Sequence, residues 1–527
     1  MKSEMKITMT RREAIRMFGA AAPMLALGKR VLAEDGPTNK IAPGPFKPTR
    51  DSLHAYSAPD WFADAKFGIW AHWGPQSAVE DGDWYARNMY MQGSPQNLYH
   101  VETYGPPSKF GFKDTIPAWK AAKWDPDHLI SMYKKAGAKY FVSMGCHHDN
   151  FDLWNSKYTR WNSVNMGPKK DIVGMWKKAA TAQGLKFGVS EHLWISYKWF
   201  AVSHGADKTG PLAGVPYDGV DPATYDLYHD ANMVQFLGER LQFDDDDIPM
   251  SWKQHYLNRI DDLVNNYQPD LLYTDGHLPF EEYGLSMVSN LYNVSSGRSG
   301  GKTTAVYNSK RPNDCEVGTC VLDRERGVLD DISANPWQTD TCIGDWHYKR
   351  GIQYKTPKKV VDLLVDIVSK NGNLLLNFPL PNSGQLDAEE MVTLDGITRW
   401  MAVNSEGIHS SRPWKIYGEG PSTKTAPADA ASTNFNENKK PELTAEDIRF
   451  TKKGSDLYVF VMGTAAKEAV IRALGTSSAQ QPGQISNVQM LGYEGKLDWK
   501  QDANSLKVQM PSQKPSDHAV TLKVQMA

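Results

Sequence analysis

The sequence predicts an α/β fold: a (β/α)8-like TIM barrel followed by a C-terminal antiparallel β-sandwich. Three observations carry this prediction. Short apolar strands alternate with helical stretches between residues 59 and 411, polar side chains stand at the ends of several of these strands, and the pattern changes after residue 412. A chain of 527 residues is long enough for a barrel and a second module.

The first region, residues 59–411, shows repeated strand–helix units. The expected strands are residues 67–71, 140–144, 186–190, 271–274, 303–307 and 374–378. The expected helices are residues 127–136, 172–183, 252–267 and 360–369, with Gly184 and Gly372 after two of them. Repeated β-then-α order is typical of parallel strands joined by crossover helices, and this many units favours a closed barrel.

The second region, residues 412–527, carries short alternating runs between Gly, Ser and Asn turns. These runs fall at residues 447–450, 456–462, 469–472 and 520–524. Such a pattern predicts an antiparallel β-sandwich. Residues 421–440 are rich in Ala, Asn and Lys and are expected to form a loop.

The N-terminal segment, residues 1–33, has the features of a twin-arginine signal peptide. Arg11 and Arg12 precede a mildly apolar run at residues 17–27, and residues 31–33 offer a cleavage-like sequence. The run is shorter than the roughly 20 residues of a membrane-spanning helix. We expect an exported protein, periplasmic or secreted, whose mature chain does not insert into a membrane, with residues 34–58 as a linker. The alternative is a chance Arg pair in a basic tail.

Charge and cysteine content narrow the function classes. The net charge of −2 provides no broad field that would attract nucleic acid or acidic lipid. Four cysteines are too few for a disulfide scaffold. Cys315 and Cys320 are close enough in sequence to bridge, but free thiols are an equal alternative.

Polar side chains at predicted strand ends point to the chemistry. Asp275 closes the apolar run 271–274, and His72 follows the strand at 67–71. His147 and His148 follow the strand at 140–144. In a barrel of this type, side chains at the carboxyl ends of the strands sit in the active-site mouth. A carboxylate, imidazoles and neighbouring Trp rings are typical of a pocket that cleaves sugars.

Sequence blocks in a fixed order make the chain resemble the α-L-fucosidases of glycoside hydrolase family 29. The blocks are residues 61–74, 83–90, 146–149 with 158–159, 170–174, 269–276, 371–377, and 404–408 with 412–414. The resemblance implies a barrel followed by a β-sandwich, in agreement with the reading of the residues. It also implies a retaining mechanism with two carboxylates and no cofactor.

The resemblance assigns the catalytic residues. Asp275 falls on the family's nucleophile position, and a retaining enzyme needs a second carboxyl group about 5–5.5 Å away. The acid/base lies some tens of residues further on, where Glu325 is the best candidate and Glu316 the next. Arg324 and Arg326 argue against Glu325, because neighbouring cations lower the pKa of a carboxyl group that must hold a proton.

The candidate substrate-binding residues are Trp70, His72, Asp83, Trp84, His147, His148, Glu191 and Tyr273. The resemblance places the three histidines at positions that hydrogen-bond sugar hydroxyls, and Trp70 lies on the same strand face as His72. The His pair invites a metal, but adjacent residues at a strand end point to opposite sides, so we expect no metal site. A metallohydrolase that uses this pair is therefore the weaker reading.

Departures from the family pattern affect which sugar the pocket is expected to bind. Asp83 stands where the family usually has Glu, and Tyr273 where it often has Trp. Ser190, Glu191 and His192 replace a common Tyr pair. An added polar partner suits a C6 hydroxyl, as in L-galactose, whereas fucose has a C6 methyl. The sequence predicts an exo-α-L-fucosidase acting on glycans; the alternatives are an α-L-galactosidase and a non-catalytic carbohydrate-binding protein.

Overall fold

The computed structural model describes residues 36–238, 240–315, 318–424, 434–464 and 467–527. The predicted export signal with Arg11 and Arg12 lies outside the described residues, as does Glu316, the second candidate for the acid/base. Residues 37–527 form one compact unit. Within the described ranges, no helix has the length and apolar composition needed to cross a bilayer.

Eight parallel strands form the predicted barrel. They are β1 Phe67–Ala71, β2 Tyr140–Cys146, β3 Lys186–Glu191, β4 Leu271–Thr274, β5 Val306–Ser309, β6 Val321–Leu322, β7 Trp337–Cys342 and β8 Gly372–Asn377. Their order in the sheet is β6-β5-β4-β3-β2-β1-β8-β7, and every pairing is parallel. A parallel bridge between Asp323, the residue after β6, and Gln338 of β7 connects the two edges of the sheet, so the barrel is nearly closed. The prediction of a barrel is confirmed.

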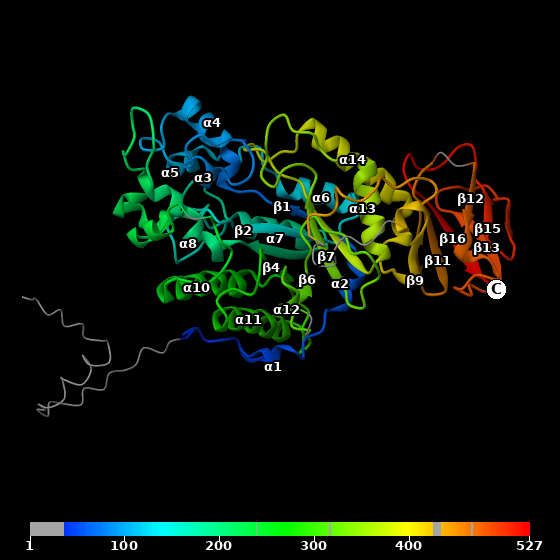
Figure 1. The fold of residues 1–527 in the computed structure, drawn as a ribbon. Helices are drawn as coiled ribbons and strands as arrows, with labels where there is room; N and C mark the ends of the chain where they lie inside the picture. The colour runs from blue at the N-terminus through cyan, green and yellow to red at the C-terminus, as the bar shows by residue number, and fades with distance from the viewer. Residues whose placement is uncertain (1–35, 239, 316–317, 425–433, 465–466) are drawn as a thin grey trace, which may run out of the picture. The chain divides into compact units, whose positions relative to one another are not determined.

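Helices surround these strands (Figure 1). The longer ones are α2 Asp60–Ala65, α4 Pro95–Tyr104, α6 Pro126–Lys135, α7 Ile172–Ala182, α10 Met250–Tyr267, α11 Glu282–Arg298, α13 Pro357–Ser369 and α14 Ala388–Asn404. The four-residue helices are α1 Arg50–Leu53, α3 Tyr85–Asn88, α5 Phe112–Thr115, α8 Ser196–Trp199, α9 Tyr225–Tyr228 and α12 Pro312–Cys315. The barrel strands are buried almost throughout, since helices cover one face and side chains fill the other.

Local signals explain where the helices begin. Asp125, Asp171 and Thr356 each accept a hydrogen bond from a backbone N–H of the first turn of α6, α7 and α13. Pro126 and Pro357 occupy the first helical positions of α6 and α13, where the missing N–H costs nothing. These signals place the predicted helices within a few residues of the observed ones.

Strand β7 was not predicted because its sequence is polar. Gln338 is buried between two barrel neighbours: its Oε1 accepts from the Tyr140 hydroxyl at 2.9 Å, and its Nε2 donates to Asp323 Oδ1 at 2.9 Å. Thr339 donates through Oγ1 to the Gly327 carbonyl at 2.6 Å. A strand that satisfies its polar side chains inside the barrel does not show the apolar pattern by which buried strands are recognised.

The C-terminal strands form two antiparallel sheets. They are β9 Arg412–Glu419, β10 Ile448–Lys453, β11 Asp456–Val461, β12 Glu468–Ile471, β13 Ile485–Met490, β14 Trp499–Gln501, β15 Leu506–Gln509 and β16 Val520–Met526. The five-stranded sheet has the order β13-β16-β11-β10-β9, and the three-stranded sheet the order β12-β15-β14. Their inner side chains share one core, which includes Phe450, Val459, Ile471 and Leu506. The prediction of a β-sandwich is confirmed.

Two further features lie beside the barrel. The segment before α2 contains α1 and buries Phe46 and Tyr56, whose rings contact Tyr292 with centroid separations of 5.2 and 4.3 Å. Cys315 and Cys320, whose state the sequence left open, form a disulfide.

Candidate active site

A cavity of about 410 Å³ opens at the carboxyl ends of the barrel strands. We call it the strand-end cavity. Side chains on or just after seven of the strands line it: Trp70 and His72, His147 and His148, His192, Asp275, Lys310, Glu325 and Asp340. Loops between the strands and helices add Asp83, Trp84, Trp194, Phe243, Gly276, His277, Arg311 and Trp346, and the segment after β9 adds Asn434 and Phe435. Converging strand ends are where this fold places its chemistry.

Asp275 occupies the first position after β4 and is fixed from several sides. Its backbone N–H donates to the Glu191 carbonyl at 3.3 Å, and its carbonyl accepts from Trp194 Nε1 at 2.7 Å. Gly276 follows with a φ of 132°, and a Cβ there would lie 2.7 Å from the Trp194 ring. Only glycine adopts this turn without displacing the Trp194 ring.

Lys310 bridges Asp275 and Glu325, and we call these three residues the carboxylate cluster. Lys310 Nζ lies 2.5 Å from Asp275 Oδ1 and 2.6 Å from Glu325 Oε2. Asp340 Oδ2 lies 3.6 Å from the same nitrogen. Burial lowers the pKa of Lys310, but Asp275, Asp340 and Glu325 outweigh it and hold the pKa well above its usual range. The bridge therefore carries a positive charge.

The two carboxyl groups have opposite protonation behaviour. Burial raises the pKa of Asp275, but Lys310 and the adjacent His192, whose Nδ1 lies 3.1 Å from Asp275 Oδ2, outweigh it and hold the pKa well below its usual range. Burial raises the pKa of Glu325 to about 7; Lys310 opposes this shift, and Asp340 and Asp275 add to it. At neutral pH Asp275 is thus ionised, while a large share of Glu325 holds its proton.

Burial answers the sequence-based objection that neighbouring arginines would lower the pKa of Glu325. The contacts of Arg326 are with other partners. Its guanidinium contacts Cys342 Sγ at 2.8 Å and stacks over the Trp346 ring at 5.1 Å. Lys310 is the largest cationic influence on Glu325, and burial outweighs it.

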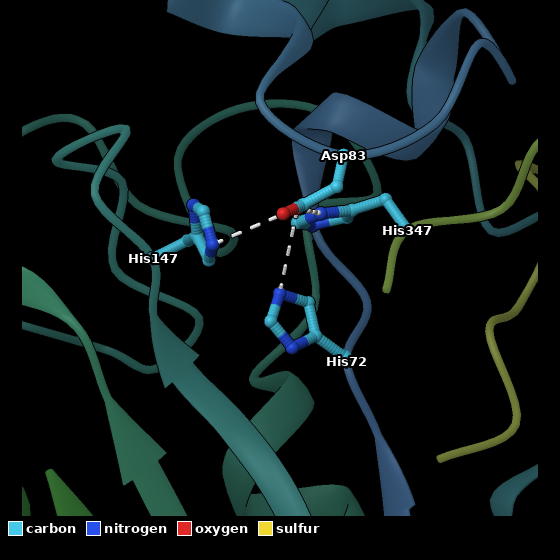
Figure 2. Close-up of side chains that lie close together, drawn as sticks. All are labelled: His72, Asp83, His147 and His347. Carbon is cyan, nitrogen blue, oxygen red and sulfur yellow. Dashed lines mark hydrogen bonds and ion pairs between the residues drawn. The ribbon is translucent and has the colours of Figure 1, made fainter. Parts of the chain in front are cut away.

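Three imidazoles and a carboxylate meet at another part of the cavity (Figure 2). Asp83 Oδ1 lies 2.6 Å from His347 Nδ1 and 3.8 Å from the Nε2 atoms of both His72 and His147. We call His72, Asp83, His147 and His347 the imidazole cluster. Both nitrogen atoms of His72 lack a hydrogen-bond partner among the described residues. Burial, and then the neighbouring imidazoles, lower the pKa values of His72 and His147 well below their usual range. Both rings are therefore neutral.

The expectation that His147 and His148 point to opposite sides is wrong. Strand β2 ends at Cys146, so the pleat does not continue through the pair, and both rings line the cavity with centroids 4.3 Å apart. Gln76 Nε2 donates to His147 Nδ1 at 2.8 Å, which leaves the proton on Nε2, toward Asp83. His148 Nδ1 donates to the His192 carbonyl at 2.7 Å, so its Nε2 is an acceptor.

The same side chains form the donor sets that could hold a metal ion. Ligand atoms of His72, Asp83, His147 and His347 lie within 4.8 Å of one another, as do those of His147, His148 and His192. Neutral imidazoles with a carboxylate suit zinc. However, two ligands of a tetrahedral zinc ion are about 3.3 Å apart, given its bond lengths. The 2.6 Å separation of Asp83 from His347 is instead that of a hydrogen bond.

Two predicted substrate-binding residues, Glu191 and Tyr273, do not belong to the lining of the strand-end cavity. Glu191 is fully buried, and its carboxylate accepts from Thr274 Oγ1 at 2.7 Å, Tyr256 OH at 2.8 Å and the Leu193 N–H at 3.0 Å. The hydroxyl of buried Tyr273 donates to Asp340 Oδ2 at 3.1 Å. Neither side chain lines the cavity, so the expectation of direct contact with a sugar does not fit this placement.

The sequence reasoning missed several wall residues. Lys310 directly follows β5, and its position after a strand was a usable signal, although the predicted strand ended three residues earlier. Asp340 lies on β7, and Trp346 and His347 lie in the loop after it. They were missed together with that strand.

Fold and site together define a class. A closed parallel barrel with an ionised and a protonated carboxyl group, surrounded by imidazole and indole rings at its strand ends, is the arrangement of a barrel glycoside hydrolase. Comparison with known proteins is more specific. A family model described as α-L-fucosidase matches residues 36–406, and one described as the α-L-fucosidase C-terminal domain matches residues 440–525. The chain belongs to the α-L-fucosidase family, glycoside hydrolase family 29.

Curated relatives and solved structures are similar to this chain over most of its length. Tissue α-L-fucosidase of Mus musculus is 26% identical over 505 residues, covering 92% of this chain and 95% of its own. Plasma α-L-fucosidase of Homo sapiens is 29% identical over 383 residues, covering 70% and 73%. The solved structure of Thermotoga maritima α-fucosidase in complex with fucose matches with a TM-score of 0.66 at 25% identity, over 91% of this chain and 99% of that one.

Proposed function

We propose that this protein is a retaining α-L-fucosidase that removes terminal α-L-fucosyl residues from glycans by double displacement. The observation that carries the proposal is the Lys310 bridge. Because Lys310 Nζ contacts both carboxylates, the bridged oxygen atoms of Asp275 and Glu325 are at most about 5.1 Å apart, which is shorter than the separation that inverting enzymes need for a water molecule.

In the first step Asp275 is the nucleophile. Its ionised carboxylate forms a bond to the anomeric carbon while the bond from that carbon to the leaving oxygen breaks. Glu325 gives its proton to the leaving oxygen. The depressed pKa of Asp275 and the pKa of about 7 of Glu325 provide both protonation states at neutral pH.

In the second step Glu325 is the base. It takes a proton from water as the water oxygen bonds to the anomeric carbon and the bond to Asp275 breaks. Once Asp275 is esterified, its negative charge is gone and no longer raises the pKa of Glu325, while Lys310 continues to lower it. The loss of one charge thus converts the acid into a base when a base is needed.

Fucose is the sugar that the site supports best. The case for L-galactose rested on Glu191 and His192. The Glu191 carboxylate is fully engaged away from the cavity, so His192 is the one of the two that lines it. Trp70 and Trp346 lie with ring centroids 5.4 Å apart on the cavity wall and provide apolar surface of the kind a C6 methyl needs. A non-catalytic binding protein would not need a charged bridge between two carboxyl groups of different pKa.

Proton NMR of the first-formed product tests this function. The enzyme should hydrolyse nitrophenyl α-L-fucoside in preference to the α-L-galactoside and the β-D-galactoside, and release α-L-fucose before mutarotation. Initial release of β-L-fucose would contradict the retaining mechanism. Turnover of the α-L-galactoside above that of the fucoside would contradict the substrate.

We also propose export through the Arg11–Arg12 pair. Changing both to Lys should leave a precursor in the cytoplasm, because the twin-arginine pathway reads the pair itself. Normal appearance of the mature enzyme outside the cytoplasm would contradict this proposal.

A further inference from the structure

Two exposed phenylalanines lie on the wall of the strand-end cavity. Phe243 is 46% exposed and Phe435 is 58% exposed, and both line the cavity. The indole rings deeper in the wall are far less exposed; Trp70 and Trp194 are each 1% exposed. Large apolar side chains left in water beside a binding pocket mark a contact surface for a ligand.

Phe435 comes from outside the barrel and is joined to the loop that carries Glu325. The Phe435 N–H donates to the Glu325 carbonyl at 2.8 Å, and the Glu437 N–H donates to the Arg326 carbonyl at 3.0 Å. Asn436 pairs twice with the Val328 backbone, accepting its N–H at 2.8 Å and donating to its carbonyl at 2.9 Å.

A buried carboxylate anchors the same segment to the barrel. Glu437 is 1% exposed; one of its oxygens lies 2.9 Å from Lys355 Nζ, and the other accepts from Thr341 Oγ1 at 2.8 Å. The backbone at Phe435 is therefore fixed relative to the Glu325 loop by backbone pairing and a buried ion pair.

Phe243 reaches the cavity from a second loop. Its ring lies 6.1 Å from Trp84 and 6.4 Å from Trp194, measured between centroids. Its carbonyl accepts from Arg311 Nη2 at 3.3 Å, and the neighbouring Asp244 pairs with Lys198. Two rings from distant parts of the chain are thus held at one cavity.

We propose that Phe243 and Phe435 form the contact surface for the leaving-group sugar and so determine which leaving groups the enzyme prefers. This inference rests on the proposed function, because it takes Glu325 as the group that protonates the leaving oxygen. Since Phe435 is one backbone hydrogen bond from Glu325 and lines the same cavity, we place its ring beside the group attached to that oxygen.

The chemistry of this contact surface favours a sugar over an apolar aglycone. A phenyl face packs on the C–H face of a pyranose. Beside it, Asn434 Oδ1 is buried, lines the same cavity and has no hydrogen-bond partner among the described residues. It can accept a hydrogen bond from a sugar hydroxyl, which a lipid or simple aryl group would not offer.

The test compares a substrate that has a leaving-group ring with one that has none. The measured quantity is the ratio of kcat/KM for an α-L-fucosyl hexose disaccharide, chosen from a linkage panel, to kcat/KM for α-L-fucosyl fluoride. Phe435→Ala should lower this ratio about tenfold, the size expected for the loss of one aromatic contact. Phe435→Tyr keeps the ring and should keep the ratio.

The outcomes are distinct. An unchanged ratio in Phe435→Ala would overturn the proposal, whether both substrates keep their rates or both lose them equally; an equal loss would show that Phe435 acts by holding the Glu325 loop. The matched control is Tyr158→Ala, an exposed aromatic outside this cavity, which should not change the ratio. Failure of the wild-type enzyme to hydrolyse the fluoride would instead refute the proposed function.

Discussion

The carboxylate cluster and three residues of the imidazole cluster, His72, Asp83 and His147, line one cavity, but the two clusters control charge in different ways. In the first, Lys310 couples Asp275 and Glu325, so that the protonation of each depends on the other. In the second, burial keeps His72 and His147 neutral, and the rings offer hydrogen bonds without net charge. The difference assigns bond breaking to the first cluster and hydroxyl recognition to the second, and this division can be tested residue by residue.

The largest effect is expected from the nucleophile. Asp275→Gly should lower turnover at least about a thousandfold, because the covalent step loses its attacking group. Azide should restore part of the rate by entering the vacated space. Turnover within tenfold of the wild type without azide would remove Asp275 from the mechanism, provided that circular dichroism shows a folded variant.

Loss of the acid/base should depend on the substrate. Glu325→Ala should slow disaccharide hydrolysis by about a hundredfold or more, and activated aryl fucosides much less, since a good leaving group needs little protonation. Steady-state rates on the two substrate types measure the difference. Equal losses would move the role to another residue, and Glu316→Ala is the next variant to measure.

The Lys310 bridge predicts a shift of the pH profile. The reaction needs Asp275 ionised and Glu325 protonated, so in the wild type kcat/KM should fall as pH rises through about 7. Lys310 lowers the pKa of both groups, so Lys310→Met should raise both and move both limbs to higher pH. A pH–rate profile that keeps its alkaline limb in place would contradict this coupling. Exposed Lys302→Met is the control and should leave both limbs unchanged.

A change in the imidazole cluster should lower kcat/KM without shifting the pH profile, in contrast to Lys310→Met. His347→Ala removes the 2.6 Å hydrogen bond to Asp83 and should lower kcat/KM about ten- to a hundredfold, the range for a hydrogen bond to a charged group. Both limbs of the pH profile should stay where they are. A shifted limb would show that the two clusters share protons and would break the division drawn above.

The smallest effect is expected from metal removal. Dialysis against EDTA should leave kcat/KM within about twofold, because Asp83 and His347 are hydrogen-bonded to each other and not spaced as zinc ligands. Loss of activity that added zinc restores would instead make the imidazole cluster a metal site.

The sequence predicted six of the eight barrel strands and the helices α6, α7, α10 and α13, because these elements follow simple rules, but it did not predict α4, α11 and α14. Apolar runs such as β4 and capped, amphipathic helices such as α6 and α13 carry their own signals. Strand β7 does not, since Gln338 and Asp340 face partners inside the barrel. Its polarity can be understood only after the neighbouring strands are in place.

The candidate site was predicted in part for the same reason. Position at a strand end was enough to propose His72 and Asp275 as cavity residues, and the structure brings both to the cavity. Glu191 also lies at a strand end, but its carboxylate accepts hydrogen bonds from Tyr256 on α10 and Thr274 on β4 and does not line the cavity. The sequence pattern does not show that these elements lie beside it. Lys310 and His347 act through partners distant in sequence, and such pairs appear only in the folded chain.

The central claim is that Asp275 forms a covalent bond to the sugar and that Glu325 acts first as the general acid and then as the general base. Incubation with 2-deoxy-2-fluoro-α-L-fucosyl fluoride, digestion and peptide mass spectrometry test it most directly. The C2 fluorine slows both steps, and the anomeric fluoride, as a good leaving group, restores formation of the intermediate so that it accumulates. The account predicts one fluorofucosyl adduct, on the peptide that contains Asp275, and none on that peptide in Asp275→Gly. An adduct on Glu325, or turnover that proceeds with no adduct on any carboxylate, would contradict it.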